Sequence, residues 1–98
     1  MPMYFFTFHA VPISAEVPTG IVGAYVNCWV QDSNIDKTEL TARRGIENNG
    51  WGITGYEYEP RQTHREEWLD GEDLQYYDQA LIDREVWMFH MYEDNEEE

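Results

Sequence analysis

The sequence predicts an α+β domain: a two-layer sandwich in which a four-stranded sheet carries two main helices on one face. Three observations lead to this prediction. The chain has 98 residues, 42 % of them hydrophobic and 15 % aromatic, which suits a single domain with its own core. Four segments have the composition of strands, and two longer segments repeat apolar residues at helical spacing. Their order gives one domain over residues 1–92 with the arrangement β-β-α-β-α-β.

The first two strands are expected over residues 4–11 and 21–30. The first is aromatic and β-branched, and Pro12 ends it. In the second, successive side chains point to opposite faces of the sheet. Small and aliphatic residues share one of these faces, and the larger side chains share the other: Tyr25, Asn27 and Trp29.

A helix is expected over residues 32–49, with the pair Asn49-Gly50 as its stop signal. Three polar residues compete for its N-cap: Asp32, Ser33 and Asp36. Its apolar stripe contains the small residues Ala42 and Gly45. Small residues on this stripe indicate close packing of the helix onto the sheet.

The remaining elements are a strand over residues 51–58, a short helix over 63–69, a second main helix over 72–83 and a last strand over 85–92. Pro60 is expected to end the first of these strands. The pattern Thr63-His64-Arg65-Glu66 has the form of a capping box and opens the short helix. Residues 93–98 form an acidic, low-complexity tail, which we expect to be disordered because its charges repel one another.

Charge is distributed unevenly along the chain. The formal net charge is −14, from 20 acidic and 6 basic residues, and 15 of the acids lie in residues 57–98 with three of the bases. A field of this sign repels nucleic-acid phosphates and anionic lipid and attracts basic proteins. We therefore expect no direct nucleic-acid or membrane binding. A solvated acidic surface that only maintains solubility is the alternative explanation.

Other sequence features limit which cellular compartment and which cofactors we expect. Cys28 is the only cysteine, so no intrachain disulfide can form, which fits a reducing compartment. A signal peptide begins with basic residues, and here no basic residue precedes Lys37. No apolar run approaches the roughly 18 residues that span a bilayer. The expected location is cytoplasmic. No spacing of histidines, cysteine or carboxylates matches a metal site, and no cofactor is expected.

The sequence favours a protein without catalysis, although it leaves the question open. A dyad of Cys28 with His9 or His90 would need a small core thiol as nucleophile, and such thiols are usually inert packing. Carboxylate pairs such as Glu57 and Glu59 lack the desolvation that raises the pKa of a general acid. The Gly-x-Gly-x-x-Gly pattern of residues 50–55 runs from a helix into a strand, the reverse of the order in dinucleotide-binding sites.

Three segments resemble a family of small uncharacterised bacterial proteins: GAYVNCWV (residues 23–30), IENNGW (46–51) and YYDQALID (76–83). The resemblance covers about residues 20–92. It implies the same α+β fold but no agreed activity and no catalytic residues. Similar proteins tend to have glycine where this chain has Arg84, so the turn into the last strand is expected to differ.

The leading hypothesis is an acidic interaction protein that binds a basic protein. Inhibition of that partner is one form of this hypothesis, as in an immunity protein, an antitoxin or a nuclease inhibitor. Acidic surfaces accelerate association with basic sites and make it sensitive to salt. The expected contacts are acids of the C-terminal part together with two aromatic anchors. They are Glu66, Glu67, Trp68, Glu72, Asp73, Tyr76, Asp78 and Asp83.

A second hypothesis follows from the sheet. If both helices cover one face, nothing in the sequence covers the other, and Tyr25, Asn27 and Trp29 are exposed there. An exposed aromatic face is typical of a dimer interface or a ligand platform. The alternative function is therefore a ligand-binding or enzymatic homodimer, with His9, His90 and Tyr25 as polar groups. A structural subunit of a larger complex is a third hypothesis.

Overall fold

Four strands, two helices and one short 3-10 helix follow one another along residues 1–93, which the computed structural model describes. They are β1 (Met3–Pro12), β2 (Ile21–Gln31), α1 (Ile35–Asn48), β3 (Trp51–Thr63), η1 (Arg65–Trp68), α2 (Leu74–Asp83) and β4 (Glu85–Glu93). The α+β class and the order β-β-α-β-α-β are therefore confirmed. Of the tail predicted over residues 93–98, Glu93 ends β4, and residues 94–98 lie outside the described residues.

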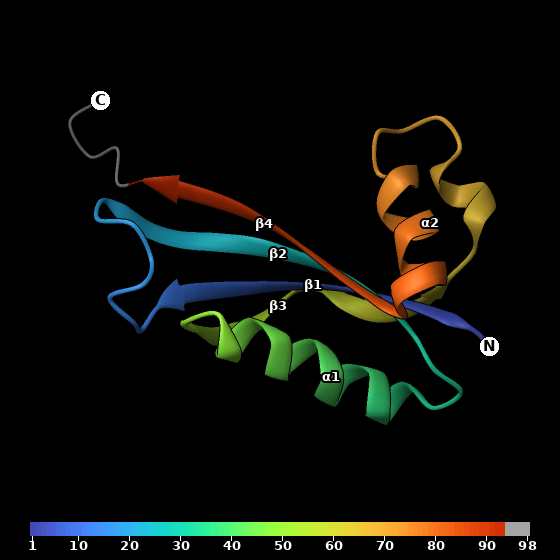
Figure 1. The fold of residues 1–98 in the computed structure, drawn as a ribbon, viewed down its shortest axis with the longest axis horizontal. Helices are drawn as coiled ribbons and strands as arrows, with labels where there is room; N and C mark the ends of the chain where they lie inside the picture. The colour runs from blue at the N-terminus through green and yellow to red at the C-terminus, as the bar shows by residue number, and fades with distance from the viewer. Residues whose placement is uncertain (94–98) are drawn as a thin grey trace.

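The strands form one antiparallel sheet in the order β3-β1-β2-β4 (Figure 1). β1 pairs with both β2 and β3, and β2 pairs with β4, so β3 and β4 are the edge strands. Paired residues point to the same face, so the sheet consists of cross-strand rows that alternate between its two faces. Phe5, Trp29 and Val86 form one row, and Phe6, Cys28 and Trp87 form the next.

The two helices lie on opposite faces of this sheet, and the prediction that they share a face is wrong (Figure 1). α1 packs through Ile46 on the face that carries Phe6. α2 packs through Tyr77 on the face that carries Trp29. The physical reason lies in the central strands, where large apolar side chains point to both faces, so that both need a cover.

The contact between α1 and β4 depends on a glycine. Trp87 of β4 lies against Gly45, where a Cβ atom would overlap its indole ring. The indole N–H of Trp87 donates a hydrogen bond to the backbone oxygen of Ala42 at 3.0 Å. The close packing that the small residues of this helix predict is therefore confirmed.

The N-cap of α1 is Asn34 and none of the three predicted residues. The Asn34 side chain accepts hydrogen bonds from the backbone N–H groups of Asp36 at 2.7 Å and Lys37 at 3.3 Å. The carboxylate of Asp32 instead accepts from the backbone N–H of Ser33 at 2.6 Å. The cap is thus the residue directly before the first helical turn.

β3 continues through Pro60 to Thr63, so the prediction that it ends before Pro60 is wrong. As an edge strand, β3 tolerates a residue without a backbone N–H. The register against β1 also shifts between Phe5 and Thr7, opposite this segment, so the regular backbone hydrogen bonds between the two strands are interrupted at Pro60. The predicted capping box is wrong as well, because the Thr63 hydroxyl donates to the carboxylate of Glu67 and η1 has no side-chain cap.

α2 ends in a turn that favours glycine. Arg84 adopts a left-handed conformation with φ 76°, and its N–H donates to the Ala80 oxygen at 2.8 Å. Its own oxygen accepts from the Gln31 N–H at 2.8 Å, which ties the turn to the end of β2.

No helix within residues 1–93 is long and apolar enough to cross a bilayer.

Candidate functional site

α2 and η1 cover only one end of their face of the sheet. Trp29 lies beneath them with an exposed fraction of 0 %, and its ring packs against those of Phe5, Trp68 and Tyr76. Trp29 therefore belongs to a small core, and the prediction that nothing covers this face is wrong at this end. Trp68 and Tyr76, predicted as anchors for a partner, are half-buried around it.

Beyond Trp29 the same face has no helix over it. We call this part the open face and define it by two cross-strand rows. The first row is Tyr58, Thr7, Asn27 and Met88, and the second is Gly55, His9, Tyr25 and His90. Tyr25 is 40 % exposed and Asn27 is half-buried, so two of the three predicted face residues do lie on an accessible surface.

A groove runs over the open face. It consists of two adjoining hollows, of about 310 Å³ and 580 Å³, which share Thr7, Asn27 and Tyr58. The smaller hollow is completed by Tyr25, Glu57 and His90. The larger hollow extends toward η1 and is completed by Phe5, Glu59, Arg61 and Trp68.

The floor of the groove is polar at its centre. The Thr7 hydroxyl donates to the side-chain oxygen of Asn27 at 2.9 Å. Within residues 1–93 the side-chain NH₂ group of Asn27 has no hydrogen-bond partner, so it points its donors to solvent or to a bound group. This polar pair occupies the next row on the same face after the large apolar side chains of Phe5 and Trp29.

The rim of the groove is acidic. Glu57 and Glu59 form no ion pair within the described part of the chain, whereas Arg61 is neutralised by Glu67 at 2.6 Å. The hydroxyl of Thr63 and then the guanidinium of Arg61 lower the pKa of the Glu67 carboxyl. The negative charges that face the groove are thus the ones without a partner.

At its far end the open face carries a hydrogen-bonded histidine. The Thr54 hydroxyl donates to the backbone oxygen of His9 at 3.1 Å, so the 2.7 Å contact between the two side chains is donated by Nδ1–H of His9. In the neutral ring with this tautomer, Nε2 accepts from the Tyr92 hydroxyl at 2.6 Å. Tyr92 reaches across β2 because Gly23 has no side chain in its path. These bonds fix His9 in place and explain it as part of the fold.

The predicted dyad of Cys28 with a histidine does not form. Cys28 is buried on the α1 face, whereas His9 and His90 lie on the open face, and β2 separates β1 from β4. Burial raises the pKa of the Cys28 thiol far above its ordinary value, which leaves it protonated and unreactive. The period of two along β1 is the signal that bears on His9, because it places His9 on the face opposite Phe6 and Phe8, which share a face with Cys28.

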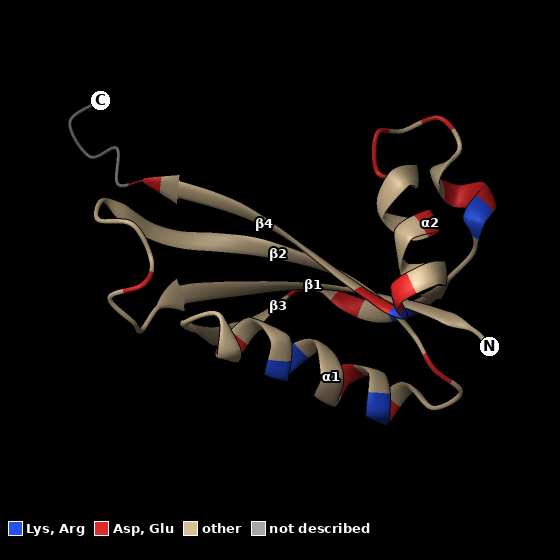
Figure 2. Cartoon of the chain, in the orientation of Figure 1, with Lys and Arg blue, Asp and Glu red and all other residues tan. Residues whose placement is uncertain are grey.

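The predicted acidic contacts gather on η1, α2 and the segment between them (Figure 2). Glu66, Glu72 and Asp83 are exposed and Asp73 is half-buried. Asp78 is paired with Arg65 at 2.8 Å, and the hydrogen bond from this guanidinium lowers the pKa of the carboxyl. Sequence reasoning missed this pair and the one between Arg61 and Glu67, because only the folded chain brings these residues together.

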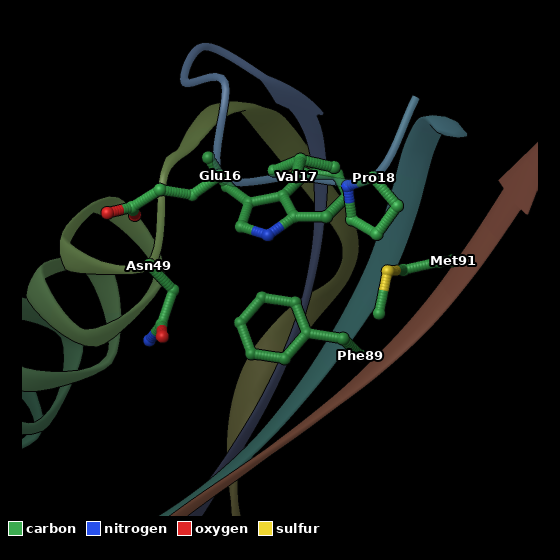
Figure 3. Close-up of a pocket in the computed structure, with 7 residues that line it drawn as sticks. Glu16, Val17, Pro18, Asn49, Phe89 and Met91 are labelled. Carbon is green, nitrogen blue, oxygen red and sulfur yellow. The ribbon is translucent and has the colours of Figure 1, made fainter. Parts of the chain in front are cut away.

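A further hollow of about 200 Å³ lies on the other side of the sheet, near the loop between β1 and β2 (Figure 3). Phe89, Met91 and Pro18 surround it, with Asn49 and Glu16 at its edge. It is smaller than the groove, and none of the predicted site residues lines it.

Among the described residues, no group of three or more ligating side chains could hold a metal ion.

In comparisons with known proteins, no family model, no curated protein and no solved structure matches this chain. The resemblance to small bacterial proteins therefore stays a prediction. The candidate site rests on the geometry and charge of the open face alone.

Proposed function

We propose that the protein binds a basic partner protein, with the open face as the docking surface. One observation carries this proposal: the groove on the open face is rimmed by Glu57 and Glu59, which form no ion pair within residues 1–93, while Arg61 is already neutralised. A partner with complementary positive charge gains the most from such a rim. Aromatic side chains beside the carboxylates, Tyr25 and Tyr58, supply contact area of the kind that anchors protein interfaces.

The wider charge distribution supports the same partner. The acids of η1, Glu66 and Glu67, lie on the element that borders the groove, since Trp68 of η1 lines it. The formal net charge of −14 would steer a basic protein toward the molecule and make the association rate fall with salt. Binding of this kind suits a cytoplasmic inhibitor of the immunity, antitoxin or nuclease-inhibitor type, with no chemical step of its own.

The test is affinity capture from the native cell extract at low and high salt, with mass spectrometry of the bound proteins. Wild-type protein should capture one basic protein in stoichiometric amount and release it at high salt. Glu57→Gln with Glu59→Gln should weaken the purified complex by about 2- to 30-fold, since each partly exposed ion pair contributes about 0.2–1 kcal/mol. The matched control is Asp36→Asn with Glu47→Gln, which removes two exposed charges from α1 and should bind like wild type.

Two results contradict the proposal. If no basic protein is captured at either salt concentration, the proposal of a basic partner is refuted. If a partner is captured and both double variants bind it equally well, the open face is not its docking surface. Charge reversal at Glu72 and Asp83 would then test whether the contact lies on α2 and the segment before it.

The alternative, a small ligand held on the open face, has one observation in its favour. The side-chain NH₂ group of Asn27 in the groove floor, which has no partner among the described residues, would orient a carbonyl or carboxylate oxygen. A thermal-shift screen of metabolites tests it. A compound that stabilises the wild-type protein but not Asn27→Ala would favour this function over protein binding.

A further inference from the structure

Two arginines of the chain are held in the same manner, one on each face of the sheet. The guanidinium of Arg43 lies over the rings of Phe8 and Tyr56, at 5.1 Å and 5.5 Å from their centroids. The same guanidinium pairs with Glu39 at 2.9 Å. A planar cation is thus stacked on two aromatic rings and held by one carboxylate.

The second example borders the groove. The guanidinium of Arg61 lies over the rings of Phe5 and Trp68, at 5.4 Å and 5.9 Å from their centroids, and pairs with Glu67 at 2.6 Å. Phe5, Arg61 and Trp68 line the larger hollow. This fold therefore stacks a guanidinium on aromatic rings beside a carboxylate at the end of its own groove.

The adjoining smaller hollow has the same components without the cation. Tyr25 and Tyr58 supply two rings, and Glu57 supplies a carboxylate that forms no ion pair within residues 1–93. Tyr58 is 66 % exposed, so its ring is free to take a contact. Neither lysine nor arginine lines this hollow, and its other residues are Thr7, Asn27 and His90.

We infer that the smaller hollow is a binding site for an arginine side chain, which in the proposed complex belongs to the basic partner. Its guanidinium stacks on the tyrosine rings and pairs with Glu57. The volume of about 310 Å³ is at the lower limit of ligand pockets, enough for one long side chain and too small for a folded segment. Arginine fits better than lysine, because a guanidinium is planar and more weakly hydrated than an ammonium group. The identity of the occupant as a partner residue rests on the proposed function; the arginine site itself does not.

The test uses N-acetyl-arginine amide as the probe and isotope-labelled protein in an NMR titration. The probe should shift the side-chain amide of Asn27 and the backbone signals of Tyr25, Glu57 and Tyr58, and N-acetyl-lysine amide should bind more weakly. Tyr58→Leu should weaken arginine binding by about 2- to 30-fold, the range of a cation–π contact. Glu57→Gln should weaken it by about 1.4- to 5-fold, the range of one exposed ion pair. Glu47→Gln, an exposed acid on the other side of the sheet, is the matched control and should bind like wild type.

Each outcome separates this inference from the proposed function. The arginine site is overturned if the probe causes no shifts, or if its shifts spread over η1 and α2 and are unchanged in Tyr58→Leu. This holds even if a basic partner still docks on the open face. Probe shifts confined to the hollow support the site even if no basic partner is captured, in which case only the proposed function fails. Arg44 of α1 is exposed and forms no ion pair within residues 1–93, so a second copy of the chain could present it. If the wild-type protein dimerises and both Tyr58→Leu and Arg44→Ala abolish the dimer, a second copy supplies the arginine, and the assignment to a partner protein is overturned.

Discussion

The packing of α1 on the sheet makes a sharp prediction at Gly45. This glycine lies within the helix and has no left-handed backbone to explain it. Its role is to let the Trp87 indole approach the helix axis and donate to the Ala42 oxygen at 3.0 Å. Gly45→Ala should therefore destabilise the protein, although alanine is the better helix former.

The expected size follows from three effects. Alanine in place of glycine in a helix normally stabilises by about 1 kcal/mol. Against this, a methyl group that overlaps the indole costs about 1–3 kcal/mol in a well-packed core. Displacement of the ring also breaks the bond to Ala42, for about 1 kcal/mol more. We expect Gly45→Ala to lower the free energy of unfolding by about 1–3 kcal/mol.

The assay is urea unfolding followed by circular dichroism. Gly55→Ala is the matched control, because a Cβ atom there meets nothing within 4 Å, and it should leave stability unchanged or slightly higher. In a Trp87→Phe background the smaller ring leaves room, so Gly45→Ala should cost less there than in the wild type. If Gly45→Ala is as stable as wild type or more stable, the close approach of Trp87 does not hold the helix, and the reasoning is refuted.

Two more predictions concern a turn and a titration. Arg84→Gly should raise the free energy of unfolding by about 0.5–1 kcal/mol, because glycine relieves the left-handed conformation but gains freedom in the unfolded chain; a loss of stability in thermal or urea unfolding would contradict this. Tyr56→Phe should raise the pKa of Glu39 toward its ordinary value, because the hydrogen bond from Tyr56 is the largest cause that lowers it. Since the folded pKa of Glu39 lies below the unfolded one, its stabilisation is present above the unfolded pKa and is lost as pH falls through the folded pKa. Tyr56→Phe should therefore show a weaker acid-induced loss of stability, and an NMR titration with an unchanged pKa of Glu39 would contradict the prediction.

The sequence predicts the elements well but not their placement. Alternation along β2 separates Cys28 from Asn27 and Trp29, as the structure confirms. A helical stripe shows that a helix has one apolar face, but it does not say which face of the sheet that stripe will cover. The signal was present in β1, where Phe5 and Phe6 are consecutive and both need burial. Reading that run as two apolar faces would have placed a helix on each side.

The site was partly predictable for the same reason. Tyr25 and Asn27 follow from the period of two, whereas Tyr58 does not, because the register shifts of β3 against β1 decide where it points. The neutralisation of Arg61 by Glu67 also depends on a strand that runs through Pro60 into η1, which the proline argued against. Long-range pairs of this kind arise from the folded geometry, and composition does not reveal them.

The open face follows from the short length of the second helix. α2 has 10 residues, or about 15 Å at 1.5 Å per residue, whereas β2 has 11 residues, or about 36 Å at 3.3 Å per residue. Even with η1 beside it, α2 leaves part of the face bare, and the composition changes where the cover ends, from Phe5 and Trp29 to Thr7 and Asn27. A face meant for an apolar dimer contact would continue the aliphatic and aromatic rows. A polar floor between tyrosine rings and carboxylates that form no ion pair in the described part of the chain favours an occupant that is itself polar and positively charged, which is the chemistry of an arginine side chain.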